Sequence, residues 1–86
     1  MAFSCTLITP EQQVLSTSAS HAVVPAHDGL VGILTGRAPI LLQLGRGRLR
    51  IQTHEGEELR YDLSGGVAQM KDNALTILAD EARQAQ

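Results

Sequence analysis

The chain has 86 residues, a formal net charge of −2, 43% apolar and 19% charged residues, which predicts one small globular domain. Its single cysteine, Cys5, excludes an internal disulfide framework and a cysteine-based zinc site. The mildly acidic balance removes the electrostatic basis for strong nucleic-acid binding. No uninterrupted apolar stretch reaches the roughly 18 residues of a membrane span. The N-terminus lacks the pattern of a secretory signal, which favours a cytosolic setting.

Alternating apolar and polar residues predict strands in the first third of the chain. Residues 2–8 alternate with period two, which is the pattern of a half-buried strand. Pro10 ends this strand because proline has no backbone N–H for a sheet ladder. Residues 14–25 form a second extended stretch of low apolar content, which predicts an edge strand or a strand that wraps between two sheets.

The middle of the chain is rich in turns. Asp28-Gly29 is a strong turn signal, because glycine accepts a positive φ without steric cost. A short strand is predicted at 31–34, and a turn follows at 35–39. The apolar run 40–44 is bounded too closely by glycine and proline to form a helix, so it is predicted as a buried extended segment.

The second half again alternates. The pattern predicts strands at 48–53, 58–63, 67–70 and 74–78, joined by a hairpin turn at 54–57, a bend at Ser64-Gly65-Gly66 and a turn at 71–73. Residues 80–86 differ, since they are rich in helix formers and Asp80 is placed like an N-cap. They are too short for a stable isolated helix.

The predicted fold is therefore all-β. We expect a small two-sheet β-sandwich of about eight to ten short strands over residues 1–80. Residues 81–86 are expected to form a short helical or frayed tail, as the first turn of a further segment.

No arrangement of residues predicts a catalytic, cofactor or metal site. His21, His27 and His54 lack the spacing of metal ligands and are expected as solvent-exposed turn residues. Ser64 lacks the Gly-x-Ser-x-Gly elbow of a serine nucleophile. Cys5 shares a face with apolar neighbours, which predicts a small buried hydrophobe. The spacing of Gly29, Gly32 and Gly36 matches neither a P-loop nor a dinucleotide fingerprint.

Two surface features point to protein contact. Arg46, Arg48 and Arg50 lie on one face of a predicted strand, and we expect cross-strand pairing with Glu55, Glu57 and Glu58 on the solvated side. The run 30–42 is unusually apolar, so some of its side chains are expected to project outward as a partner-binding patch. The alternative is a strand buried on both faces. The residues taken by themselves thus indicate an interaction domain.

A family resemblance enters at this point. Residues 24–41, VPAHDGLVGILTGRAPIL, resemble the signature loop of the epsilon subunit of bacterial F-type ATP synthases, called delta in mitochondria. The opening strand with Pro10-Glu11, the stretch Gly47–Ile51 and the closing pair from Ser64 to Asp80 are also similar, in the same order. The resemblance covers nearly the whole chain.

Three departures from the family pattern stand out. Thr35-Gly36-Arg37-Ala38-Pro39 replaces the usual Pro-Gly-His-Ala-Pro, and Leu30 stands where the family often has an acidic residue. Family chains also commonly continue past the position of Asp80 into a helical hairpin associated with inhibition of ATP hydrolysis. The hairpin mechanism is therefore not expected of these 86 residues.

The resemblance implies a non-catalytic rotor subunit of the central stalk, without cofactor, at the cytoplasmic face of the bacterial membrane. Its implied partners are the gamma subunit and the c-ring, and its task is to couple ion-driven ring rotation to the stalk. The implied gamma contacts are Thr9, Arg37, Leu41 and Leu42, and the implied c-ring loop is Asp28, Gly29 and Leu30.

Two other functions stay open at this stage. The first is a free-standing β-sandwich adaptor that is not part of an ATP synthase. The second is a small hydrolase that uses Ser64 and a histidine. Gly29 also has a purely structural interpretation as a turn former.

Overall fold

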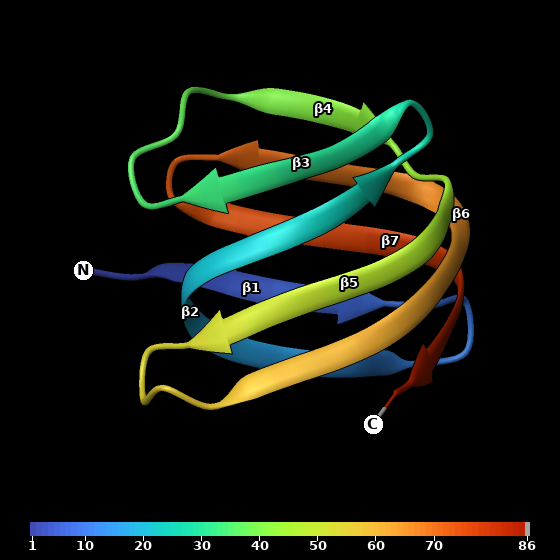
Figure 1. Cartoon of the computed structure of the whole chain (residues 1–86), viewed down its shortest axis with the longest axis horizontal. Helices are drawn as coiled ribbons and strands as arrows, with labels where there is room; N and C mark the ends of the chain where they lie inside the picture. Colours follow the sequence, from blue (N-terminus) through green and yellow to red (C-terminus); the bar gives the residue numbers. More distant parts are fainter. Residues whose placement is uncertain (86) are drawn as a thin grey trace.

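The computed structural model describes residues 1–85 as seven strands joined by short turns (Figure 1). The strands are β1 (Phe3–Ile8), β2 (Gln13–Ala26), β3 (Gly29–Leu34), β4 (Ile40–Gln43), β5 (Arg46–Thr53), β6 (Glu58–Lys71) and β7 (Ala74–Gln84). The all-β prediction is confirmed. Among these residues there is no helix that is long and apolar enough to cross a membrane.

The predicted number of eight to ten strands is wrong, because long strands continue through positions predicted as boundaries. β6 runs unbroken for 14 residues through Ser64-Gly65-Gly66. The bend itself is confirmed, since Gly65 and Gly66 have φ angles of +72° and +117°. A Cβ atom on Gly66 would collide with the backbone of Leu78 and Ala79, so glycine lets β6 and β7 stay paired through the bend.

The long strands join the two layers of the sandwich into one closed barrel. The hydrogen-bonded order is β1-β7-β6-β5-β2, and β2 returns to pair with β1. β3 pairs with the second half of β2, and β4 pairs with the second half of β6. β2 therefore takes part in both layers, which confirms the expectation of a wrapping strand.

The core is aliphatic, as a chain with one Phe, one Tyr and no Trp requires. On β5, Leu49, Ile51 and Thr53 point inward and are buried, while the residues between them are solvent-exposed or partly so. Burial of a large apolar side chain such as Leu49 or Ile51 contributes about 1.5–3 kcal/mol to the stability of the fold. The largest fully buried side chains are Phe3, Leu7, Ile33, Leu49, Ile51, Leu63, Met70, Leu75 and Ile77, with Val24 and Cys5.

The prediction of a helical or frayed tail is wrong for the residues described. β7 extends to Gln84, where it pairs with Tyr61 of β6, and the Ala85 N–H donates a 2.8 Å hydrogen bond to the Arg60 carbonyl. Pairing with the edge of β6 therefore decides the conformation of residues 80–84. Their local preference for helix is weak, because the segment is too short for a stable helix. The boundary predicted at residue 80 falls inside β7, and residue 86 of the predicted tail lies outside the described residues.

Candidate partner-binding surface

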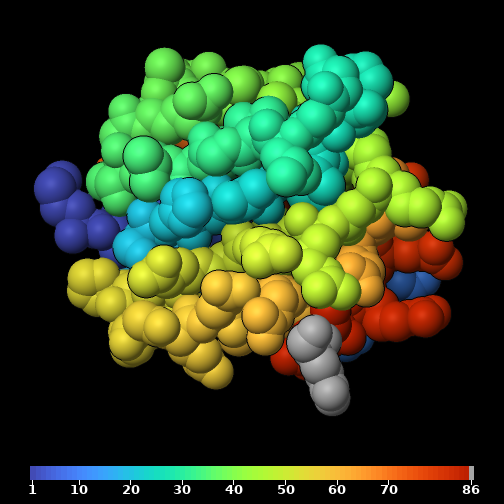
Figure 2. Space-filling model, viewed as in Figure 1, coloured from blue at the N-terminus to red at the C-terminus, as the bar shows by residue number. Residues whose placement is uncertain are grey.

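Large apolar side chains are exposed on β3, β4, β6 and β7. Leu30 and Leu41 are 71% and 70% exposed, and Leu34, Val67 and Leu78 are also solvent-exposed. The expectation that part of the apolar run projects outward is therefore confirmed. The alternative, a strand buried on both faces, is wrong, because only Ile33 of β3 is buried. In Figure 2 the segment from β3 to β4, coloured teal to green, forms the upper end of the molecule.

Three of these side chains lie on one side of adjacent strands. Val67 of β6 is paired with Gln43 of β4 and with Leu78 of β7, and Leu41 is two residues from Gln43 on β4. Directly paired residues share a face of the sheet, as do residues two apart on a strand. We call Leu41, Val67 and Leu78 the β4–β7 apolar face. Exposed apolar side chains gathered on one side of a sheet in this way are typical of a protein contact.

The structure separates the four residues implied as gamma contacts. Leu41 and Arg37 are exposed, whereas Leu42 is partly buried and packs against the core. Thr9 is only 8% exposed, and its hydroxyl donates a 3.3 Å hydrogen bond to the Gln12 carbonyl in the β1–β2 turn. Sequence reasoning did not identify Val67 and Leu78, although their outward position follows from the buried alternation of their neighbours.

The loop implied as the c-ring contact is exposed and firmly attached. Asp28, Gly29 and Leu30 all lie at the surface where β2 turns into β3. Gly29 has a φ of +140° with open space around its Cα, so its backbone conformation and not its small size requires glycine. The neighbouring His27 N–H donates a 2.9 Å hydrogen bond to the Gln43 carbonyl, which ties this loop to the end of β4.

The β3–β4 loop, which carries Arg37, is attached by a hydrogen bond to the β6–β7 turn. The Gly36 N–H donates a 2.8 Å hydrogen bond to Oδ1 of Asn73, in the β6–β7 turn. The Arg37 N–H donates to the Leu34 carbonyl at 3.2 Å. These bonds fix the β3–β4 loop beside β4, so Arg37 and Leu41 belong to one positioned segment.

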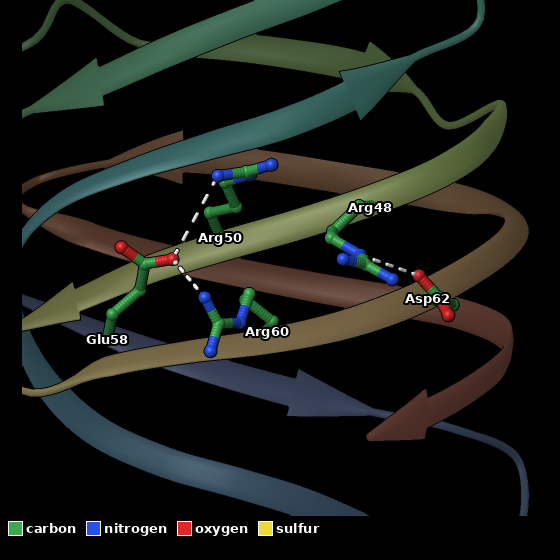
Figure 3. A network of polar contacts seen from close by, with 5 residues as sticks. All are labelled: Arg48, Arg50, Glu58, Arg60 and Asp62. Atoms are coloured by element: carbon green, nitrogen blue, oxygen red, sulfur yellow. Dashed lines mark hydrogen bonds and ion pairs between the residues drawn. The ribbon is translucent and has the colours of Figure 1, made fainter. Parts of the chain in front are cut away.

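Arg48 and Arg50 of β5 form ion pairs with side chains of β6 on the outer face of the other layer (Figure 3). Arg48 Nε lies 3.1 Å from Asp62 Oδ1, and Glu58 Oε2 lies 3.1 Å from Arg60 and 4.0 Å from Arg50. The expected cross-strand pairing is confirmed for Glu58, while Asp62 takes the place expected for Glu55 and Glu57. These side chains are about half exposed, so each pair contributes under about 1 kcal/mol.

The candidate nucleophiles do not form a catalytic site in the described part of the chain. Cys5 is fully buried, and burial raises the pKa of its thiol to about 12, so it is a neutral thiol at physiological pH. The Ser64 hydroxyl accepts a 3.5 Å hydrogen bond from Arg46. Among residues 1–85 no side-chain hydrogen bond joins Ser64 to a histidine, and no three His, Cys, Asp or Glu residues are grouped to hold a metal.

The closed β-barrel, the exposed apolar face and the two anchored loops define a small all-β domain suited to protein contact. Residues 2–85 match the family described as "ATP synthase, Delta/Epsilon chain, beta-sandwich domain". The chain belongs to this family.

Known relatives agree with this assignment. The chain is 40% identical over 82 residues to the ATP synthase epsilon chain of Rhodopirellula baltica, covering 95% of this chain and 63% of the relative. It is 37% identical over 79 residues to that of Alkalilimnicola ehrlichii, covering 92% and 56%. The chain therefore spans roughly three fifths of the length of these curated relatives.

Solved structures show the same fold. A chain in the mitochondrial ATP synthase of Euglena gracilis, in an assembly of OSCP, F1 and c-ring, superposes with a TM-score of 0.90 at 25% identity. That alignment covers 96% of this chain and 53% of the other. A chain from the central stalk and c-ring of the Tetrahymena thermophila enzyme superposes at 0.76 with 20% identity, covering 92% and 63%.

Proposed function

We propose that this chain is the β-sandwich part of a non-catalytic central-stalk subunit of an F-type ATP synthase. In this role it binds the gamma subunit and the c-ring and couples ion-driven rotation of the ring to ATP synthesis. The observation that carries the proposal is the family match over residues 2–85 together with an exposed apolar face on β4, β6 and β7. In a bacterium, the domain would lie at the cytoplasmic face of the membrane, attached only through the complex.

The two partners are assigned to two neighbouring surfaces. Gamma would cover the β4–β7 apolar face and Arg37, because burial of exposed leucine side chains favours a lasting contact. The c-ring would meet the loop Asp28-Gly29-Leu30. Leu42 supports the gamma surface from beneath, through its packing on the core. Thr9 supports the β1–β2 turn through its hydrogen bond to Gln12.

The closed barrel suits a part that transmits force. Every strand is hydrogen-bonded to at least one neighbour, and β1, β7, β6, β5 and β2 form a closed ring. A force applied to one loop is therefore transmitted through hydrogen-bonded strands to the rest of the domain. The Gly36–Asn73 and His27–Gln43 hydrogen bonds attach the two contact loops to the β6–β7 turn and to β4, which is itself paired with β6. The proposal assigns no chemical step and no cofactor to the chain.

Mixing the chain with the gamma subunit of its own organism tests the proposal. A one-to-one complex on a sizing column is the expected result, and a serine-reactive fluorophosphonate probe is expected to leave the chain unlabelled. Separate elution of the two proteins at micromolar concentrations would favour a free-standing adaptor instead. Labelling of Ser64 would favour the hydrolase.

A further inference from the structure

Gly32 is the one glycine within residues 1–85 that the fold itself does not require. Five of the chain's eight glycines have a positive φ, and a Cβ atom on Gly45 or Gly47 would lie 2.9 Å from the nearest atom of another residue. Gly32 has no positive φ, and a Cβ atom there would meet nothing within 4 Å. Glycine weakens the interior of a strand, where it often marks the close approach of another backbone. The glycine at position 32 therefore indicates a contact with a second molecule.

Gly32 lies in a gap between two exposed leucines. Leu30 and Leu34 are 71% and 59% exposed, whereas Val31 is partly buried and Ile33 is fully buried. Successive residues of a strand point to opposite faces, so Leu30, Gly32 and Leu34 share the outer face of β3. We call these three residues the β3 notch. Figure 2 shows this strand, coloured teal to green, uncovered on the surface of the molecule.

A hollow of about 310 Å³ adjoins the β3 notch. Gly32 and Leu34 line it together with residues 35–38 of the β3–β4 loop. Among these lining residues only Arg37 is charged, so most of the hollow suits an uncharged group. Arg37 is assigned to gamma under the proposed function, so the notch lies next to the gamma surface.

The edge of β3 lacks the protection that is typical of edge strands. Within residues 1–85, β3 pairs with β2 alone, and this pairing contains no bulge. Edge strands usually carry a charge, a proline or a bulge that prevents pairing with other chains. None of the residues Gly29–Leu34 is charged, and none is proline. A partner that covers β3 in the assembled protein explains this uncharged composition.

We propose that the β3 notch is a further part of the c-ring contact, with Gly32 as the residue of closest approach. This inference rests on the proposed function. Leu30 belongs both to the loop assigned to the c-ring and to the notch, so one surface continues from the loop along β3. The matching part of a c subunit is an uncharged turn. Its backbone lies against Gly32, and an apolar side chain of the turn packs between Leu30 and Leu34.

Binding of the chain–gamma complex to the purified c-ring of the same organism, measured with labelled chain, tests the proposal. Gly32→Val is expected to weaken c-ring binding at least about tenfold, because the new side chain fills the notch. Gly32→Ala adds a single methyl group and is expected to weaken it by a smaller factor. Both variants are expected to bind gamma like the wild type. Their unfolding midpoints in urea should stay close to or above the wild-type value, because a Cβ atom at position 32 meets no other atom of the chain.

A control variant and a cross-link separate the notch from the rest of the proposed function. Ser16→Val adds bulk at an exposed position of β2 that pairs with β1, and it is expected to leave c-ring binding unchanged. A photoreactive amino acid at Leu34 is expected to cross-link to the c subunit in the assembled enzyme.

The possible failures of this test are distinguishable. A wild-type complex that does not bind the c-ring contradicts the proposed function and, with it, this inference. If the wild-type complex binds and Gly32→Val binds equally well, the proposed function stands and the inference about the notch is wrong. Loss of gamma binding in Gly32→Val, or a Leu34 cross-link to gamma alone, assigns the notch to gamma and also overturns the inference.

Discussion

Leu41 is the single residue on which the proposed gamma contact depends most. Its side chain is 70% exposed on β4, so Leu41→Asp is expected to leave the fold intact. In a complex with gamma the new carboxylate would be buried without a partner, and affinity is expected to fall at least about tenfold. Titration of labelled chain with gamma measures this loss. Gln52→Asp, on the exposed outer side of β5, is the matched control.

Arg37 is expected to matter less than Leu41. It lies exposed in the β3–β4 loop, where a rim charge affects association rate more than affinity. Arg37→Ala should therefore cost less affinity for gamma than Leu41→Asp in the same titration. The reverse ranking would show that the contact is centred on the loop and not on the apolar face.

Gly66 is the residue most sensitive to a small change. Gly66→Ala places a Cβ atom against the backbone of Leu78 and Ala79, at a φ of +117°. We expect the free energy of unfolding in urea to fall by about 2–4 kcal/mol. Gly32→Ala meets nothing within 4 Å at an ordinary φ, and its effect should stay within about 0.5–1 kcal/mol. Equal effects of the two substitutions would contradict the bend described for β6.

Burial of Cys5 makes the free energy of unfolding depend on pH in the alkaline range. Burial raises the pKa of its thiol from 9.0 to about 12, so the folded chain disfavours the thiolate. This contribution to stability is fully present below pH 9.0 and is lost as the pH rises toward 12. Unfolding free energy should fall by about 1.4 kcal/mol per pH unit in that range. In Cys5→Ala the decline should be shallower, and an identical decline would remove Cys5 as its source.

Among the strands, the sequence pattern predicts best those with one buried, apolar face and one exposed, polar face. β1 and β5 alternate between buried and exposed residues, and their positions were predicted closely. The end of β7 was predicted as helix or frayed chain because residues 80–84 are polar and helix-favouring. Their strand conformation comes from pairing with β6, a long-range contact that a local pattern does not contain.

Hydrogen exchange tests the pairing of this last segment. The amides of Arg83 and Ala85 are directed to β6 and should be protected. The amides of Ala82 and Gln84 face away from β6, beyond the end of the β1–β7 pairing, and should exchange faster. Uniformly rapid exchange over residues 80–85 would indicate a frayed tail instead of a strand.

The candidate surface was predicted only in part. The apolar run and the exposed loop at residues 28–30 could be read from the sequence, because turn signals and leucines are local features. The alternation in β6 and β7 places Val67 and Leu78 outward, but sequence order does not reveal that they adjoin Leu41, because this depends on the pairing of β4, β6 and β7. Assigning a surface across three strands requires knowing which strands are neighbours.

The molecule as a whole is a closed barrel of five strands, with β3 and β4 paired to it at one end. The β2–β3 and β3–β4 loops lie at the end of the molecule formed by β3 and β4 (Figure 1), and hydrogen bonds attach them to β4 and to the β6–β7 turn. Under the proposed function, gamma covers the β4–β7 apolar face in the assembled enzyme.

Site-specific photo-cross-linking in the assembled ATP synthase tests whether gamma covers this face. A photoreactive amino acid at Leu41 should cross-link to gamma, one at Leu30 should cross-link to the c subunit, and one at Glu57 should cross-link to neither. A complex in which the Leu41 position gives no gamma product, or no more than the Glu57 position gives, would contradict the account.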